Sequence, residues 1–148
     1  MKIMVVGGGG REHAIIKKIK ENPQVTELYA LPGNGGIAKD ATCVDIAAKD
    51  VEGVVAFAKE KGIDFAVVAP DDPLVLGMVD ALNAIGIPCF GPDKKAAILE
   101  GSKVFSKNLM KEFHIPTAAY EVFDDPAKAL CYIEEKNEYP VVIKADGL

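Results

Sequence analysis

The feature that most constrains the fold of this chain is an apolar run, Lys2–Val6, that leads directly into four glycines, Gly7–Gly10. A helical pattern follows, with Ala14, Ile15 and Ile19 expected on its apolar face. A buried strand, a glycine turn and a helix in this order are typical of the first unit of a parallel α/β sheet. Because glycine lets the backbone approach a ligand and helix amides attract anions, the segment also predicts a phosphate-binding turn. The alternative is a glycine turn that only packs the helix against the sheet.

Strand and helix patterns continue to alternate up to about residue 90. We expect further strands at Glu27–Leu31, Cys43–Ile46, Asp64–Ala69 and Pro88–Phe90. Asp50 is predicted to cap a helix that runs through Lys59 and is closed by Gly62. Another helix is predicted to open at Pro73 and to run to about Ala84. Strands that are apolar on both faces indicate a sheet covered on both sides, so the predicted fold class is α/β, a doubly wound parallel sheet.

The pattern changes after Gly91 and Pro92. Beyond them the sequence predicts, in order, two helices, a strand, a helix and a strand, at Lys94–Glu100, Ser102–Phe113, Ala118–Val122, Pro126–Glu135 and Pro140–Lys144. We therefore expect one domain over residues 1–100 and the start of a second over 101–148. Because the sequence stops on a glycine turn just after a strand, we expect this second domain to be incomplete.

Composition excludes several classes of protein. The 148 residues are 49% hydrophobic and 26% charged, which is ordinary for a folded globular domain. A net charge of −5 argues against nucleic acid as the main partner, and no apolar stretch approaches the ~20 residues of a membrane span. Cys43, Cys89 and Cys131 have no metal-ligand or CxxC spacing, which favours reduced thiols and a cytoplasmic location.

The residues after Gly9 and Gly10 are candidates for ligand contact, because doubly wound folds bind ligands at the carboxyl edge of the sheet. Arg11 can pair with a phosphate, and Glu12 can accept from ribose hydroxyls or an amine. Glu12 can also serve only the helix dipole, and the neighbouring His13 can be a half-buried spacer. A nicotinamide site is disfavoured because Glu12 occupies the position of the third glycine and the second strand ends without an acid.

Two more loops are expected at the same edge. Pro32–Gly36 is richer in glycine than a single turn requires, so it is either a second anion-binding loop or a mobile connector. In the next loop Asp71 is a candidate hydroxyl or amine acceptor, whereas Asp72 is expected to cap the following helix. Farther on, Lys103 opens a helix and Lys144 ends an apolar run, from which its ammonium group could reach a phosphate. The alternative for each is an ordinary exposed lysine.

Taken together, these segments resemble the phosphoribosylamine–glycine ligase family of the ATP-grasp superfamily; the residues that carry the resemblance are Gly7–Ala14, Pro32–Asn34, Pro70–Leu74, Phe90–Pro92, Leu99–Lys103, Ile115–Thr117 and Val142–Gly147. The resemblance implies a Rossmann-like domain followed by the beginning of an ATP-grasp domain. It also implies that ATP phosphorylates glycine, and that 5-phosphoribosylamine then attacks the acyl phosphate to give glycinamide ribonucleotide, with Mg²⁺ or Mn²⁺ bridging the phosphates.

The resemblance assigns roles to individual residues. The residues implied to line the phosphoribosylamine side are Gly9, Gly10, Arg11, Glu12, Asn34 and Asp71, while Lys103 and Lys144 are implied to face the ATP phosphates. Asp71 stands where the family commonly has Glu, which shortens its reach. The metal ligands are expected beyond Leu148, so these 148 residues alone are expected not to ligate glycine. The alternative is a sugar-phosphate or nucleotide-binding module without catalysis.

Overall fold

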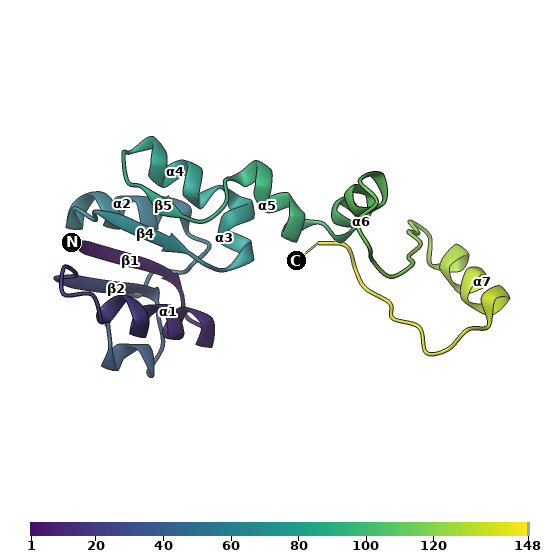
Figure 1. Cartoon of the computed structure of the whole chain (residues 1–148), viewed down its shortest axis with the longest axis horizontal. Coiled ribbons are helices and arrows are strands. Elements are labelled where there is room, and N and C mark those ends of the chain that lie inside the picture. The colour runs from purple at the N-terminus through teal and green to yellow at the C-terminus, as the bar shows by residue number, and fades with distance from the viewer. Residues whose placement is uncertain (148) are drawn as a thin grey trace. The chain divides into compact units, whose positions relative to one another are not determined.

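The computed structural model describes residues 1–147, which form two compact units, one over Met1–Gly101 and one that begins at Ser102. The first unit contains a five-stranded sheet in the order β3-β2-β1-β4-β5 (Figure 1). Its strands are β1 (Lys2–Gly7), β2 (Glu27–Pro32), β3 (Thr42–Cys43), β4 (Phe65–Val68) and β5 (Cys89–Phe90). All four neighbouring pairs are parallel, and Met4 of β1 is in register with Tyr29 on one side and Ala66 on the other. The predicted α/β parallel fold is thus confirmed.

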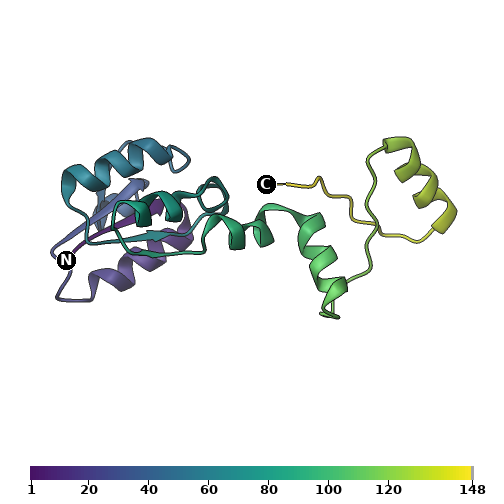
Figure 2. The same ribbon diagram turned by 90° about the horizontal axis from the view of Figure 1, so that it is seen from above.

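The two faces of the sheet carry separate apolar clusters. Met4 and Val6 of β1 belong to one cluster and Val5 to the other, as the alternation of side chains along a strand requires. The first face is covered by α2 (Val51–Lys61), α3 (Asp71–Leu76), α4 (Met78–Ala84) and α5 (Lys94–Gly101), and the second by α1 (Gly10–Lys20) and the 3₁₀ helix η1 (Ile37–Lys39). Figures 1 and 2 show α1 and α2 on opposite sides of the sheet. Full burial of an apolar side chain stabilises the fold by about 1.5–3 kcal/mol.

The buried face of helix α1 matches the predicted face only in part. Ala14 is exposed, while Glu12 and Ile16 are the buried residues of the helix. Ile15 and Ile19 pack at the margin of the cluster, as expected. The prediction placed apolar residues inward and therefore missed that a carboxylate occupies a buried position of this helix.

The structure confirms the cap and the stop predicted for α2, but it does not confirm the extent predicted for the next helix. Asp50 accepts a hydrogen bond from the Gly53 amide at 2.9 Å, and Gly62 ends α2 in the left-handed region. The single helix predicted from Pro73 is instead two helices, because α3 begins earlier and Gly77, at φ 90°, separates it from α4. Proline is compatible with the interior of the first turn, where amides lack helical partners in any case.

Two loop details also differ from expectation. Asp72 does not cap a helix, because it lies inside the first turn of α3 and forms an ion pair with Lys49. The third strand ends at Cys43 rather than at Ile46. The ladder cannot continue, since the neighbouring strand ends at Pro32, which has no amide hydrogen.

The second unit contains α6 (Lys103–Glu112) and α7 (Pro126–Lys136), joined by an extended segment (Figure 2). Ser102 and Asp125 cap the two helices through their side chains. The strands predicted at Ala118–Val122 and Pro140–Lys144 do not form, and no residue of this unit is buried within the described part of the chain. A strand needs the hydrogen bonds of a neighbour, which no described segment supplies. No helix described over residues 1–147 is long and apolar enough to cross a membrane.

Candidate functional site

The glycine turn lies where the strand order reverses. From β1 the chain continues to β2 on one side, and β4 joins on the other, so the carboxyl ends of β1 and β4 flank the position at which doubly wound folds bind ligands. Gly7, at the end of β1, has φ 127°, and a Cβ there would lie 2.5 Å from Cγ of Glu12 and 2.9 Å from Cγ of Pro70. Only glycine fits this position, and its small size brings the loops after β1 and β4 into contact.

A second loop packs against the first. The Gly33 amide donates to the carbonyl oxygen of Gly7 at 3.2 Å, and Nδ2 of Asn34 donates to the carbonyl oxygen of Gly8 at 2.7 Å. Oδ1 of Asn34 accepts from the amides of Gly36 and Ile37 at 2.7 and 2.9 Å. The Asn34 side chain therefore shapes its own loop and ties it to the glycine turn.

Glu12 is the buried charged residue of the site, with 3% of its surface exposed. Its Oε2 accepts from the amide of Gly9, the N-cap of α1, at 2.6 Å. Its Oε1 is buried and has no hydrogen-bond partner within residues 1–147. Because a buried carboxylate oxygen without a partner is costly, Oε1 is suited to accept from a ligand hydroxyl or amine. Oε2 of Glu12 thus orders the loop, and Oε1 remains available to a ligand donor.

Arg11 borders an open hollow of about 640 Å³ beside the glycine turn. The hollow is lined by Arg11, Ile15, Val68, Ala69, Leu74, Cys89, Phe90, Gly91 and Pro92. Arg11 is exposed and has no ion-pair partner in the described chain, so its guanidinium group can meet an incoming anion. Burial raises the pKa of the Cys89 thiol to about 11, which keeps that thiol unreactive.

The remaining residues predicted for the sugar-phosphate side lie at the same edge. Gly10 is the exposed first residue of α1, and a Cβ there would meet nothing within 4 Å. Asp71 is the first residue of α3 and directly follows Pro70, which packs against Gly7. The structure therefore gathers six of the eight candidates at one sheet edge: Gly9, Gly10, Arg11, Glu12, Asn34 and Asp71.

The two lysines predicted to face ATP both belong to the second unit. Lys103 begins α6 and donates through Nζ to the carbonyl oxygen of Gly147. The Asp146 carboxylate accepts from the Val104 amide at 3.1 Å, and this bond, with smaller help from the Ser102 hydroxyl, lowers the pKa of Asp146. Lys144 is exposed and has no ion pair in the described chain.

Sequence reasoning missed a polar pair behind the site. Nε2 of His13 lies 2.9 Å from Oδ2 of Asp40, and Nζ of Lys20 lies 3.2 Å from its Oδ1. The hydrogen bond from His13, followed by that from Lys20, lowers the pKa of Asp40. No local spacing signals this pair, because its members are distant in sequence and meet only through the fold.

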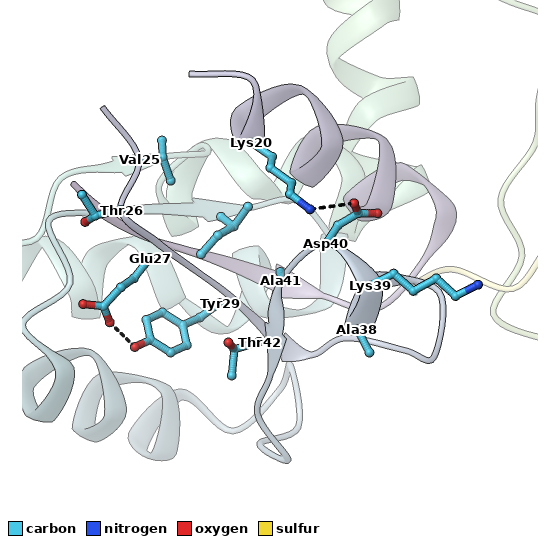
Figure 3. A pocket seen from close by; sticks show the side chains of 11 residues that line it. Lys20, Val25, Thr26, Glu27, Tyr29, Ala38, Lys39, Asp40, Ala41 and Thr42 are labelled. Atoms are coloured by element: carbon cyan, nitrogen blue, oxygen red, sulfur yellow. Dashed lines mark hydrogen bonds and ion pairs between the residues drawn. The ribbon is translucent and has the colours of Figure 1, made fainter. Parts of the chain in front are cut away.

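A second hollow, of about 590 Å³, lies beside β2 (Figure 3). It is lined by Lys20, Val25, Thr26, Glu27, Leu28, Tyr29, Ala38, Lys39, Asp40, Ala41 and Thr42. The Tyr29 hydroxyl donates to the Glu27 carboxylate, which lowers the pKa of Glu27 and raises that of Tyr29. This hollow shares none of the eight candidate residues. No group of three His, Cys, Asp or Glu side chains over residues 1–147 is placed to hold a metal ion.

Comparison with known protein families shows to which family the chain belongs. Residues 1–100 match the family described as "Phosphoribosylglycinamide synthetase, N domain", and residues 101–148 match its ATP-grasp (A) domain. The chain belongs to the phosphoribosylglycinamide synthetase family. The family resemblance drawn from the sequence motifs is thus confirmed.

Similar proteins carry a consistent name. The chain is 52% identical over 148 residues to the phosphoribosylamine–glycine ligase of Agrobacterium fabrum and 48% identical to that of Caldanaerobacter subterraneus. It spans all of its own length but only 35% of theirs.

Solved structures agree with these relatives. The phosphoribosylamine–glycine ligase of Thermotoga maritima aligns with the whole chain, and with 34% of its own chain, at a TM-score of 0.72 and 35% identity. The biotin carboxylase domain of a single-chain bacterial carboxylase aligns over 99% of this chain and 37% of its own, with a TM-score of 0.71. At 14% identity, this second likeness concerns the fold alone.

Proposed function

We propose that this chain provides the N-terminal part of an ATP-dependent ligase that joins glycine to 5-phosphoribosylamine, a cytoplasmic step of purine biosynthesis. The observation that carries the proposal is the identity of 48–52% over every residue of the chain to proteins named phosphoribosylamine–glycine ligase. The geometry at the sheet edge supports it, because the site offers both a cation and a buried acceptor for a phosphorylated amino sugar.

The proposal assigns the binding of phosphoribosylamine to residues 1–100. Arg11 and the amino end of α1 receive the phosphate, since both favour an anion. Oε1 of Glu12 accepts a hydrogen bond from the amine or a ribose hydroxyl, which would give the unpartnered oxygen a donor. Asn34 holds the neighbouring loop in place, and Asp71 supplies a further acceptor at the rim.

The proposed reaction has two steps. A carboxylate oxygen of glycine attacks the γ-phosphorus of ATP, which forms glycyl phosphate and releases ADP. The amine of phosphoribosylamine then attacks the acyl carbon, phosphate leaves, and the nitrogen loses a proton to give glycinamide ribonucleotide. Residues 101–148 contribute Lys103 and Lys144, whose charges would offset those of the nucleotide phosphates. Mg²⁺ or Mn²⁺ would supply further charge neutralisation, with ligands outside the described residues.

Calorimetric titration of the 148-residue chain with glycinamide ribonucleotide tests the binding part of the proposal. We expect saturable binding, and we expect Arg11→Ala to weaken it by about 1.5–3 kcal/mol, the range of a charged hydrogen bond. Lys18→Ala is the matched control, because Lys18 is an exposed cation of the same helix, and its ion pair is with the neighbouring Glu21. Equal affinities for Arg11→Ala and the wild type would remove Arg11 from the site.

A second assay concerns catalysis. Glycine-dependent formation of ADP is measured with the 148-residue chain, ATP, Mg²⁺ and phosphoribosylamine. We expect no turnover, because the proposal locates the metal ligands outside these residues. Turnover at a measurable rate would show that the division of labour proposed here is wrong.

A further inference from the structure

We propose that His13 and Asp40 are positioning residues, which clamp the Gly33–Gly36 loop against the glycine turn and so set the geometry of the ligand site. This inference rests on the proposed function for the identity of the ligand. It adds two residues that do not themselves touch the ligand, and it explains how a loop rich in glycine holds a fixed position.

The clamp joins the two elements that flank the site. His13 lies in the first turn of α1, directly after Glu12. Asp40 is the C-cap residue of η1 and directly follows Lys39. Their side chains meet at 2.9 Å and are only 27% and 19% exposed. Oδ1 of Asp40 forms an ion pair with Nζ of Lys20, in the last turn of α1, as Figure 3 shows. One carboxylate therefore bonds to both ends of the same helix.

The glycine loop lies directly against this pair. A Cβ on Gly36 would lie 3.3 Å from Cε1 of His13 and 3.1 Å from Oδ1 of Asn34, so the exposed Gly36 backbone lies beside both side chains. Asn34 in turn donates to the carbonyl oxygen of Gly8. A movement of His13 would therefore be passed through Gly36 and Asn34 to the glycine turn.

Other contacts, from Asn34 and Ile37, hold the loop at different points, and the clamp acts at Gly36. Ile37 is fully buried and anchors η1 on the sheet together with Ile16. The stretch before it contains Gly33, Gly35 and Gly36, whose lack of side chains leaves the backbone with wide conformational freedom. Packing against His13 limits that freedom, which reduces the entropy that ligand binding must overcome.

The test compares His13→Ala, His13→Gln and Asp40→Asn in the 148-residue chain. Glutamine keeps a hydrogen-bond donor and much of the bulk beside Gly36, so it should retain most of the function of His13. The control is Lys18→Ala combined with Glu21→Ala, which removes an exposed ion pair from the same helix without touching either loop. The measurements are the affinity for glycinamide ribonucleotide, the urea midpoint, and the hydrogen exchange of the Gly36 and Ile37 amides.

We expect His13→Ala to weaken binding about tenfold, or ~1.4 kcal/mol, at urea concentrations where the chain is fully folded. The Gly36 and Ile37 amides should exchange faster, while those of β4 do not change. Asp40→Asn should give a smaller effect in the same direction, and His13→Gln should lie near the wild type. A lower urea midpoint with unchanged affinity and unchanged exchange at Gly36 would overturn the proposal, because it would assign the pair a purely structural role.

Failure of the proposed function gives a different result. If the wild-type chain does not bind glycinamide ribonucleotide, the identity of the ligand is wrong, and the exchange of the Gly36 and Ile37 amides still decides whether His13 holds the loop. Faster exchange in His13→Ala would then support the clamp, and unchanged exchange would refute it.

Discussion

The two units of this chain have similar helices but very different interiors. In the first unit, side chains such as Met4, Ile16 and Leu82 are fully buried between the sheet and its helices. In the second unit, α6 and α7 are capped as well as α2 is, yet no residue described over 102–147 is buried. Helices thus follow from local signals, whereas strands and a core require partners from distant parts of the sequence.

Removal of one leucine side chain from each unit should give the largest contrast. Leu82→Ala, in α4, should lower the free energy of unfolding by about 2–5 kcal/mol, because it leaves a cavity in a packed core. Leu130→Ala, in α7, should change it by less than about 0.5 kcal/mol, since Leu130 is 57% exposed. Urea unfolding followed by circular dichroism measures both. Similar losses would mean that α7 packs against a core not visible in the contacts described.

Two glycines with positive φ sharpen the comparison. Gly7→Ala should cost about 1–3 kcal/mol, since it combines an unfavourable φ with overlap against Glu12 and Pro70. Gly147→Ala has a comparable φ of 100°, but a Cβ there would meet nothing within 4 Å. We expect its effect to be confined to the local backbone and to leave the unfolding midpoint unchanged. A shifted midpoint in Gly147→Ala would contradict a purely local effect.

Helix caps provide a third pair. Asp50→Ala should lower the stability of the first unit by about 0.5–2 kcal/mol, because the Gly53 amide loses its acceptor. Asp125→Ala removes the equivalent bond to Ala127, at 2.8 Å, and should reduce the helix content of 126–136 without moving the main unfolding transition. Cα chemical shifts report the second effect. Their persistence in Asp125→Ala would show that packing, rather than capping, maintains α7.

Acid titration should give the smallest contrast. The pKa values of Asp40 and Asp146 are both lowered in the folded chain, by His13 and by the Val104 amide respectively. Each stabilising contribution is therefore complete above the unfolded pKa, near 3.9, and is lost as the pH falls through the lower folded value. For Asp40, the loss of stability should appear as a lower urea midpoint of global unfolding at acid pH. Asp40→Asn should make that midpoint less dependent on pH. For Asp146 it should appear only as faster exchange of the Val104 amide, and a global effect would argue against local titration.

The sequence was sufficient for the features that depend on neighbours in the chain. The strand at Lys2–Val6, the cap at Asp50 and the glycine stop at Gly62 all follow from local patterns, and the structure confirms them. The parallel arrangement followed from strands that are apolar on both faces. The edge of the sheet at which the candidate residues lie could then be predicted, because the carboxyl ends of parallel strands meet at one edge.

The split of the predicted helix at Gly77 has a local cause, whereas the other main errors arise from contacts that are distant in sequence. The strand predicted at Pro140–Lys144 has the right composition but no neighbour in the described chain, so its apolar residues remain exposed. The sequence predicts Glu12 as a candidate ligand contact, but it does not predict the burial of Glu12, which depends on packing against Gly7. The pair formed by His13 and Asp40 depends on how η1 is positioned against α1, and no local sequence pattern predicts that position.

The central position of β1 has a consequence for how the chain is made. Strand β1 precedes the other four strands of its sheet in the sequence, and it pairs on one side with β2, where Lys2 meets Glu27, and on the other with β4, where Ile3 meets Phe65. On the ribosome the β1–β2 pair and helix α1 can assemble early, and the second edge of β1 must wait for β4 to emerge. During that interval the backbone groups that later bind β4 face solvent. The glycine turn is therefore synthesised before the loop that contains Pro70, and its contact with Pro70 forms only after the sheet closes around β1.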